Sequence, residues 1–382
     1  MKRIKLMIAA LGLFLIAQAA QAQWSPAKRL TWTALDSEWP AIDVHYSGNL
    51  YIAWHDWTPG NGEIYFRMST DGGTNWTMST RLTWNSGTSW YPDIIADYFG
   101  NPHVVWADTT PGQEEVYYKK STDGGATWTA IKRLTWNSGN SRFPMIAFDS
   151  YGNLHVVWFD NTSGNEEIYY AKSTDGGNKW TTSRRLTWTA GTSNRPTIVV
   201  DCYNNLHVFW FDDTPENYEI YHKKSTDGGT TWTANQRLTW TEGSSMVADC
   251  AVDSLNNLHL VWFDWTPGSP EVFYKKSSDG GAHWTANKRL TWNAGNSGAA
   301  RIAVDSSNNP HVVWQDNTSG SYEIYYKKST DGGGTWTAGQ RLTWISGDSN
   351  YPVLAVDPSG VVHVVWSDDC FGGAEIFYKR GN

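Results

Sequence analysis

Short apolar segments alternate with turn-forming residues along the whole chain, which predicts β-strands and not helices. In one sample stretch, residues 143–149, 154–160, 167–173 and 180–188 have the alternation or apolar character of strands. A tight turn at 150–153, a polar loop with Gly and the sequence Asp175-Gly176-Gly177 separate them. Strands of this length between Gly, Asn and Asp clusters are typical of all-β proteins. The sample predicts four strands per unit.

The unit recurs at a fixed spacing of 52 residues. The sequence Ser-Thr-Asp-Gly-Gly-x-x-Trp begins at Ser69, Ser121, Ser173, Ser225, Ser277 (with Ser278 for Thr) and Ser329. The sequence Arg-Leu-Thr-Trp begins at Arg29, Arg81, Arg133, Arg185, Arg237, Arg289 and Arg341. A constant period of this length indicates a repeat architecture. Seven units of four antiparallel strands predict a single all-β domain, a seven-bladed β-propeller over residues 23–382.

The two ends of the chain complement each other. The last repeat, residues 352–382, stops where its fourth strand would follow, and residues 24–32 match the fourth strand of the other repeats. We therefore expect the N-terminal strand to complete the last blade and close the ring, which removes an open sheet edge.

Residues 1–22 have the features of a secretory signal peptide. Lys2, Arg3 and Lys5 precede an apolar run, and Ala20-Gln21-Ala22 offers a cleavage site. We expect cleavage near Ala22 and a secreted or periplasmic protein. The formal net charge of −8 argues against nucleic-acid partners. No later apolar run predicts membrane insertion, and none of the three cysteines occupies a repeated position.

Comparison of the repeats separates recurring positions from variable ones. Of the 25 tryptophans, 21 occupy three recurring positions, and recurring Asp, Glu and His residues accompany them. We interpret these as framework, with the Asp and Glu residues bonding loop backbone or the recurring Arg. The four other tryptophans, Trp39, Trp57, Trp90 and Trp265, fall in two kinds of loop that share one face. They predict a stacking surface for a ligand, together with Tyr91, Phe143, Tyr218, Tyr322 and Tyr351. Alternatively, they fill gaps between loops or plug the central channel.

Three arginines are also unique to single repeats. Arg142, Arg195 and Arg301 lie near the start of the first strand of their repeats, where a propeller brings its strands toward the axis. Guanidinium groups bind carboxylates in a forked geometry, so these residues are candidates for an acidic group of the ligand. The alternative is local pairing with acids of the same loops.

The sequence Ser-x-Asp-x-Gly-x-x-Trp resembles the Asp box, or BNR repeat, of the sialidase-like β-propeller superfamily. The resemblance implies that the box forms the turn between the third and fourth strands, away from the active site. A structural role therefore follows for Asp71, Asp123, Asp175, Asp227, Asp279 and Asp331. If the chain is a glycosidase of this type, the resemblance implies an arginine clamp and catalytic residues among Asp93, Tyr91, Tyr351 and Glu38. The Arg-Ile-Pro motif of the family is absent from the first repeat, where Trp39-Pro40 stands.

These patterns favour a protein that binds carbohydrate or another extracellular ligand on its loop face. The alternatives are a glycoside hydrolase of sialidase type and a non-enzymatic scaffold for protein partners. Phosphate-binding loops, zinc-ligand spacings and nucleophile elbows are missing from the sequence. We therefore expect no cofactor and no metal.

Overall fold

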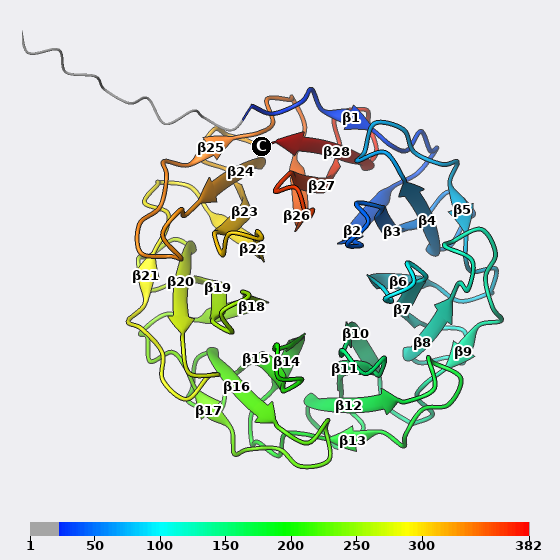
Figure 1. The fold of residues 1–382 in the computed structure, drawn as a ribbon, viewed down its shortest axis with the longest axis horizontal. Helices are drawn as coiled ribbons and strands as arrows, with labels where there is room; N and C mark the ends of the chain where they lie inside the picture. Colours follow the sequence, from blue (N-terminus) through cyan, green and yellow to red (C-terminus); the bar gives the residue numbers. More distant parts are fainter. Residues whose placement is uncertain (1–22, 382) are drawn as a thin grey trace, which may run out of the picture.

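The computed structural model describes residues 23–381 and consists of seven four-stranded antiparallel sheets around a central axis (Figure 1). The predicted seven-bladed propeller is confirmed. No helix occurs in this part of the chain, and accordingly none that is long and apolar enough to cross a membrane. The predicted signal peptide, residues 1–22, lies outside the described residues.

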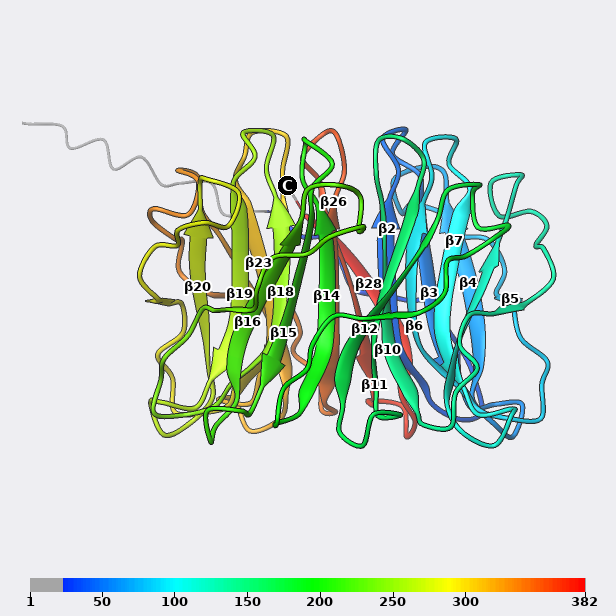
Figure 2. The same cartoon turned by 90° about the horizontal axis from the view of Figure 1, so that it is seen from below.

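Each blade runs from the axis outward, and the side view shows the strands standing roughly parallel to that axis (Figure 2). The innermost strands are β2 (Ser37–Val44), β6 (Ser89–Ala96), β10 (Ser141–Phe148), β14 (Ser193–Val200), β18 (Ser245–Val252), β22 (Ser297–Val304) and β26 (Ser349–Val356). The second strands are β3 (Leu50–Asp56), β7 (Pro102–Asp108), β11 (Leu154–Asp160), β15 (Leu206–Asp212), β19 (Leu258–Asp264), β23 (Pro310–Asp316) and β27 (Val362–Asp368).

The outer half of each blade is built in the same way. The third strands are β4 (Glu63–Ser69), β8 (Glu115–Lys120), β12 (Glu167–Ser173), β16 (Glu219–Ser225), β20 (Glu271–Ser277), β24 (Glu323–Lys328) and β28 (Glu375–Gly381). The outermost strands are β5 (Thr80–Arg81), β9 (Lys132–Arg133), β13 (Arg184–Arg185), β17 (Gln236–Arg237), β21 (Lys288–Arg289), β25 (Gln340–Arg341) and β1 (Lys28–Arg29).

Strand β1 closes the ring, as the sequence predicts. It pairs with β28 in the last blade, with Lys28 opposite Tyr378 and Arg29 opposite Phe377. Trp24 forms a further isolated bridge with Gly381. Figure 1 shows the N-terminal β1 beside the C-terminal β28, so the first and last segments of the described chain share one sheet.

The outermost strands are shorter than predicted. In the third blade the expected strand covered residues 180–188, whereas the ladder comprises only Arg184–Arg185. The N–H of Thr181 donates to Lys172 O and the N–H of Leu186 donates to Ile168 O, and the register of these two bonds differs by one residue. An extra residue interrupts the ladder, as in a β-bulge, so the strand follows its neighbour without continuous pairing.

The hydrophobic cores lie between neighbouring blades. One cluster combines Val105 and Val116 of the second blade with Val156 and Trp158 of the third. The recurring tryptophan of the second strand is at most 2 % exposed in every blade. Burial of such large side chains at each interface contributes most of the driving force for closing the ring.

The recurring charged residues serve the framework, which confirms their interpretation from the sequence. Arg81 Nη2 lies 2.8 Å from Glu63 Oε1, and the equivalent ion pair occurs in all seven blades. Asp56 accepts hydrogen bonds from the Ser37 hydroxyl at 2.8 Å and from the Thr58 N–H at 2.8 Å. These groups join each blade to the loops at its end.

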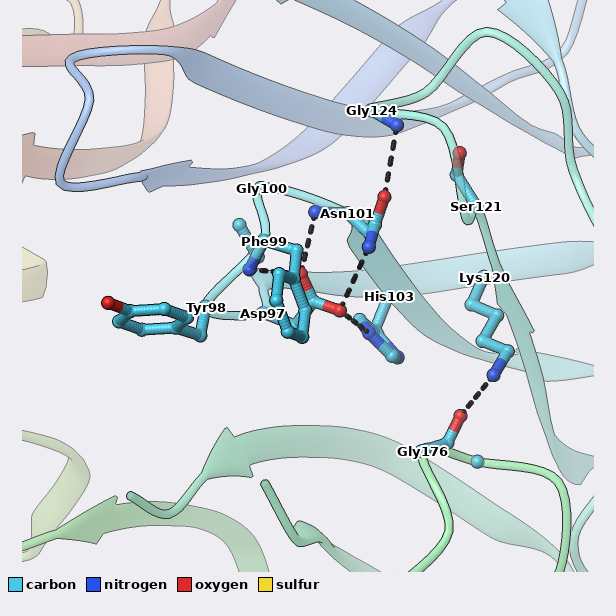
Figure 3. Close-up of polar contacts among 12 residues, drawn as sticks. Asp97, Tyr98, Phe99, Gly100, Asn101, His103, Lys120, Ser121, Gly124 and Gly176 are labelled. Carbon is cyan, nitrogen blue, oxygen red and sulfur yellow. Dashed lines mark hydrogen bonds and ion pairs between the residues drawn. The ribbon is translucent and has the colours of Figure 1, made fainter. Parts of the chain in front are cut away.

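The Ser-Thr-Asp-Gly-Gly turn links the third and fourth strands. In all six copies the Asp carboxylate accepts from the Ser hydroxyl two residues before it and from the N–H four residues after it. The N–H and side-chain amide of Asn75 lower the pKa of Asp71 to about 2. Neighbouring repeats also meet here, because Lys120 Nζ donates to Gly176 O of the following turn (Figure 3).

Candidate functional site: the axial cavities

Each innermost strand contains a β-bulge, where its pairing with the second strand shifts register. One residue in each bulge has a positive φ between 46° and 53°: Trp39, Tyr91, Phe143, Arg195, Val247, Ala299 and Tyr351. We call these seven residues the axial ring. A left-handed backbone costs a side-chain-bearing residue on the order of 1–3 kcal/mol, and such strain clusters at functional sites. The repetition of this strained geometry in seven blades marks the axis as a candidate site.

Aromatic side chains close one side of the axial ring. Trp39 stacks on Tyr351 with ring centroids 4.0 Å apart, and Tyr91 stacks on Phe143 at the same separation. Trp39 also contacts Tyr91 edge to face at 5.0 Å. The Arg195 guanidinium carbon lies 4.4 Å from the Phe143 ring centroid. Side chains from blades 1, 2, 3, 4 and 7 therefore meet at the axis.

The other side of the ring is open because Val247 and Ala299 are small. A cavity of about 410 Å³ lies there, within the size range of ligand pockets. Arg195 and Arg301 contribute its charged wall. The other lining residues are Trp39, Pro40, Met246, Val247, Phe263, Trp265, Pro270, Asn296, Gly298, Ala299, Gln315, Tyr322, Tyr351, Pro352 and Val353. Trp265 is 45 % exposed, so an indole face remains accessible at this cavity.

A smaller cavity of about 180 Å³ shares Arg195 and Arg301 with the first and also has Asp93 and Asp249 in its wall. Asp93 Oδ2 accepts from the Ile146 N–H at 2.8 Å, and Asp249 Oδ2 accepts from the Ile302 N–H at 2.9 Å. Each carboxylate thus holds the innermost strand of the next blade. Burial raises the pKa of Asp93 to about 7 and also raises that of Asp249, against the lowering effect of Arg301.

The raised pKa of Asp93 predicts a pH-dependent stability. Because its folded pKa of about 7 exceeds its ordinary value of 3.8, protonation favours the folded state. The contribution of the protonated Asp93 carboxyl to the free energy of unfolding is complete below pH 4 and is lost as the pH rises through 7. We expect Asp93→Asn to reduce the fall in unfolding free energy across this window by roughly 2–4 kcal/mol. Asp43 and Asp249 also have raised pKa values, so part of the slope remains. Urea unfolding at several pH values measures how the free energy of unfolding depends on pH. An unchanged pH dependence in Asp93→Asn contradicts a raised pKa for Asp93.

Four of the seven ligand-binding candidates from the sequence line the larger cavity: Trp39, Trp265, Arg195 and Arg301. Trp57, Trp90 and Arg142 line neither cavity. Trp90 stacks on Tyr91 with ring centroids 5.3 Å apart, and the ring centroids of Trp57 and His55 are 6.0 Å apart. Arg142 pairs with Glu114, so the alternative of local pairing holds for this arginine. The three arginines therefore do not form one clamp, although two of them share a cavity.

The four catalytic candidates do not gather in one cavity. Tyr351 lines the larger cavity, Tyr91 and Asp93 line the smaller one, and Glu38 lines neither. Glu38 Oε2 instead lies 3.6 Å from His55 Nε2. Burial, followed by the charge of Glu38, raises the pKa of Tyr351, which keeps its phenol protonated. Within residues 23–381, no three His, Cys, Asp or Glu residues are grouped so that they could hold a metal ion.

Sequence reasoning missed the small residues that create the larger cavity. Val247 and Ala299 carry no chemical signal of their own, but they stand where other repeats have Trp, Tyr, Phe or Arg. The following residue gives the same signal: five repeats have Pro, whereas these two have Ala248 and Ala300. Gln315 was also missed. Its Oε1 accepts from the Tyr351 N–H at 2.8 Å, which holds the ring residue beside the cavity.

Comparisons with known proteins support the fold. No family model matches the sequence, and no curated protein matches it. Among solved structures, a protein of unknown function from Dyadobacter fermentans is similar over 93 % of this chain and 99 % of its own, with TM-score 0.59 and 14 % identity. An ulvan lyase from a polysaccharide lyase family is similar over 92 % and 95 %, with TM-score 0.65 and 11 % identity. A variant of the NanB sialidase from Streptococcus pneumoniae is similar over 92 % and 70 %, with TM-score 0.53 and 11 % identity. At these identities the likeness shows the fold alone, a β-propeller.

Proposed function

We propose that this protein is an exported carbohydrate-binding protein whose ligand enters the larger axial cavity. The observation that carries the proposal is that two guanidinium groups, Arg195 and Arg301, line the same cavity as the aromatic side chains Trp265 and Tyr322. Aromatic rings pack against the C–H faces of sugars, and guanidinium forks bind carboxylates. The ligand class that fits both is an acidic sugar, such as a uronic or sialic acid.

The charge state of the cavity favours an anion. Burial, and secondarily the charge of Arg301, lower the pKa of Arg195. Two like charges that share a cavity repel each other, so a bound carboxylate relieves an unfavourable interaction. The buried carboxylates Asp93 and Asp249 face the smaller cavity and their raised pKa values favour the neutral form. They offset the arginine charges only partly.

Binding fits the geometry better than hydrolysis. The four catalytic candidates do not line one cavity, and burial raises the pKa of Tyr351, so its phenol stays protonated. The carbohydrate class draws further support from the sialidase and the polysaccharide lyase among the structural neighbours. Export rests on the leader-like residues 1–22 and on no structural observation. In this proposal the protein needs no cofactor.

A glycan array with residues 23–382 tests the proposal. The array contains sialylated and uronic-acid glycans beside their neutral counterparts, and every bound glycan is assayed for released sugar. We expect binding of acidic glycans without release. Release of sugar overturns the binding proposal in favour of a glycosidase, and absence of binding moves the search to protein partners.

The arginines of the larger cavity are expected to determine affinity. For an acidic glycan selected on the array, Arg301→Met or Arg195→Met weakens binding by about 10- to 100-fold, because a charge-assisted hydrogen bond contributes roughly 1.5–3 kcal/mol. Arg142→Met is the matched control, since this arginine pairs with Glu114 outside both cavities. Isothermal titration calorimetry measures all three. Equal loss in the control, or no loss in either cavity variant, contradicts the assignment.

A further inference from the structure

A second set of aromatic side chains lies on the outside of the propeller. The recurring tryptophan of Arg-Leu-Thr-Trp follows the outermost strand of each blade, and every copy is exposed. These residues, which we call the rim tryptophans, are Trp32 (67 % exposed), Trp84 (64 %), Trp136 (71 %), Trp188 (65 %), Trp240 (69 %), Trp292 (68 %) and Trp344 (65 %). Their recurrence suggested a framework role, but the exposure of the indoles does not fit one.

The other residues of the tag account for its structural role. Leu82 is fully buried, and its N–H donates to Ile64 O at 2.7 Å. Thr83 is also fully buried, and its hydroxyl accepts from the Ile64 N–H at 2.9 Å. Trp84 follows directly, yet about two thirds of its surface stays in contact with solvent. An indole in this position adds little to the core, so packing does not explain why all seven repeats have Trp here.

Each rim tryptophan stands beside a fixed cation. Arg81 Nε donates to Thr83 O at 2.6 Å and Nη2 donates to Glu63 Oε1 at 2.8 Å, with the guanidinium carbon 5.7 Å from the Trp84 centroid. The other six sites repeat this arrangement at 5.6–5.9 Å. In none of the seven does Nη1 have a partner within the described part of the chain, and the side chains are 21–27 % exposed. A pinned guanidinium with one spare donor therefore adjoins each open indole.

A lysine of the following blade completes most sites. Lys119 Nζ donates to Leu82 O at 2.7 Å and lies 5.3 Å from the Trp84 centroid. The Nζ atoms of the corresponding lysines, Lys223, Lys327 and Lys379, lie 5.3–5.8 Å from the ring centroids of Trp188, Trp292 and Trp344. The sites thus sit at the junctions between blades, where two elements hold them in place.

We propose that the rim tryptophans form seven weak, similar binding sites for the sugar rings of an anionic polysaccharide. Each site offers a flat apolar platform of one ring's size and a guanidinium donor, and four sites add the positive charge of a lysine; these groups suit a sugar ring carrying a carboxylate or sulfate. The sites are separate and do not form one apolar patch, which favours a polymer of repeated units over a folded protein partner. Seven copies on one closed ring raise the effective affinity for such a polymer. These sites are independent of the axial cavity.

The test is affinity electrophoresis of residues 23–382 in gels containing polygalacturonate, alginate or carboxymethylcellulose, with hydroxyethylcellulose as the uncharged comparison. We expect at least one anionic polymer to retard the wild-type protein. Trp→Ala at Trp84, Trp188 and Trp292 weakens this retardation about tenfold or more, and substitution of all seven removes the part of it that the axial cavity does not supply. The triple variant carries the test if the sevenfold variant does not fold. The thermal unfolding midpoint of the triple variant stays within a few degrees of the wild type, because little buried surface is removed.

Two controls separate binding at the rim tryptophans from binding at other exposed aromatic side chains and in the axial cavity. A triple Ala variant at Phe99, Tyr151 and Tyr203, which are 74–82 % exposed in the turns between first and second strands, keeps full retardation. The Trp variants are also compared in an Arg301→Met background, in which binding in the axial cavity contributes little to the retardation. Absence of retardation of folded wild-type protein in all three anionic gels overturns the proposal. So does full retardation of the triple or sevenfold Trp variant, or retardation by hydroxyethylcellulose alone.

Discussion

Replacing Ala299 with tyrosine is expected to abolish binding in the larger axial cavity while leaving the propeller folded. Ala299 has φ 49°, and the equivalent positions in two other blades hold Tyr91 and Tyr351 at φ 52° and 53°. The backbone therefore accepts tyrosine here without new strain. The added ring occupies the space that Ala299 leaves open in the cavity of about 410 Å³. We expect affinity for an acidic glycan to fall by about 100-fold or more, as measured by isothermal titration calorimetry.

The control for Ala299→Tyr is Phe143→Tyr. Phe143 belongs to the same axial ring but does not line the larger cavity, so its replacement tests the effect of a new phenol alone. Both variants should unfold within a few degrees of the wild type. Unchanged affinity in Ala299→Tyr places the ligand elsewhere, and equal loss in Phe143→Tyr means that the aromatic side of the ring also contributes to binding.

Gly177→Ala is expected to destabilise the protein by about 3–5 kcal/mol. Gly177 has φ +86°, and a Cβ atom built on it would lie 2.0 Å from the Tyr118 hydroxyl oxygen of the neighbouring blade. Tyr118 is 2 % exposed and its hydroxyl lies 2.6 Å from His103 Nδ1, so it has little freedom to move. The cost combines left-handed strain with overpacking. Denaturant unfolding measures the change.

Gly164→Ala is the matched control for this substitution. Gly164 has φ +103°, but nothing lies within 4 Å of a Cβ placed on it. This variant therefore reports the conformational cost alone, about 1–2 kcal/mol. Equal losses in the two variants would contradict the idea that the Ser-Thr-Asp-Gly-Gly turn locks one blade against the next.

The repeat made the fold predictable, because its period sets the blade number and its turn residues set the strand boundaries. The strands Leu154–Asp160 and Glu167–Ser173 were predicted with the bounds observed. The outermost strands were predicted too long. The apolar pattern does not reveal that a register shift of one residue interrupts the hydrogen-bonded pairing between the third and fourth strands of a blade. The sequence also cannot show that one recurring tryptophan position is buried, as at Trp54 in β3, while another is exposed, as at Trp84 after β5, because recurrence reports repetition and not burial.

The candidate site was only half predictable. The unusual arginines pointed to the axis and the unusual tryptophans to the loop face, and four of these residues line the larger cavity. The cavity itself exists because Val247 and Ala299 are small, and an absent side chain is visible only against the other repeats. Arg142 shares its residue type and approximate position with Arg195, yet it lies one residue earlier in the repeat and pairs with Glu114. A difference of one residue on a strand reverses the face to which a side chain belongs.

A crystal structure of residues 23–382 soaked with an acidic oligosaccharide selected on the array tests the central claim most directly. The account predicts density for a sugar ring in the larger axial cavity, against Trp265 and Tyr322, with its carboxylate within hydrogen-bond distance of Arg195 or Arg301. Density for the oligosaccharide only at the rim tryptophans or in the smaller cavity, with the larger cavity empty, would contradict the account.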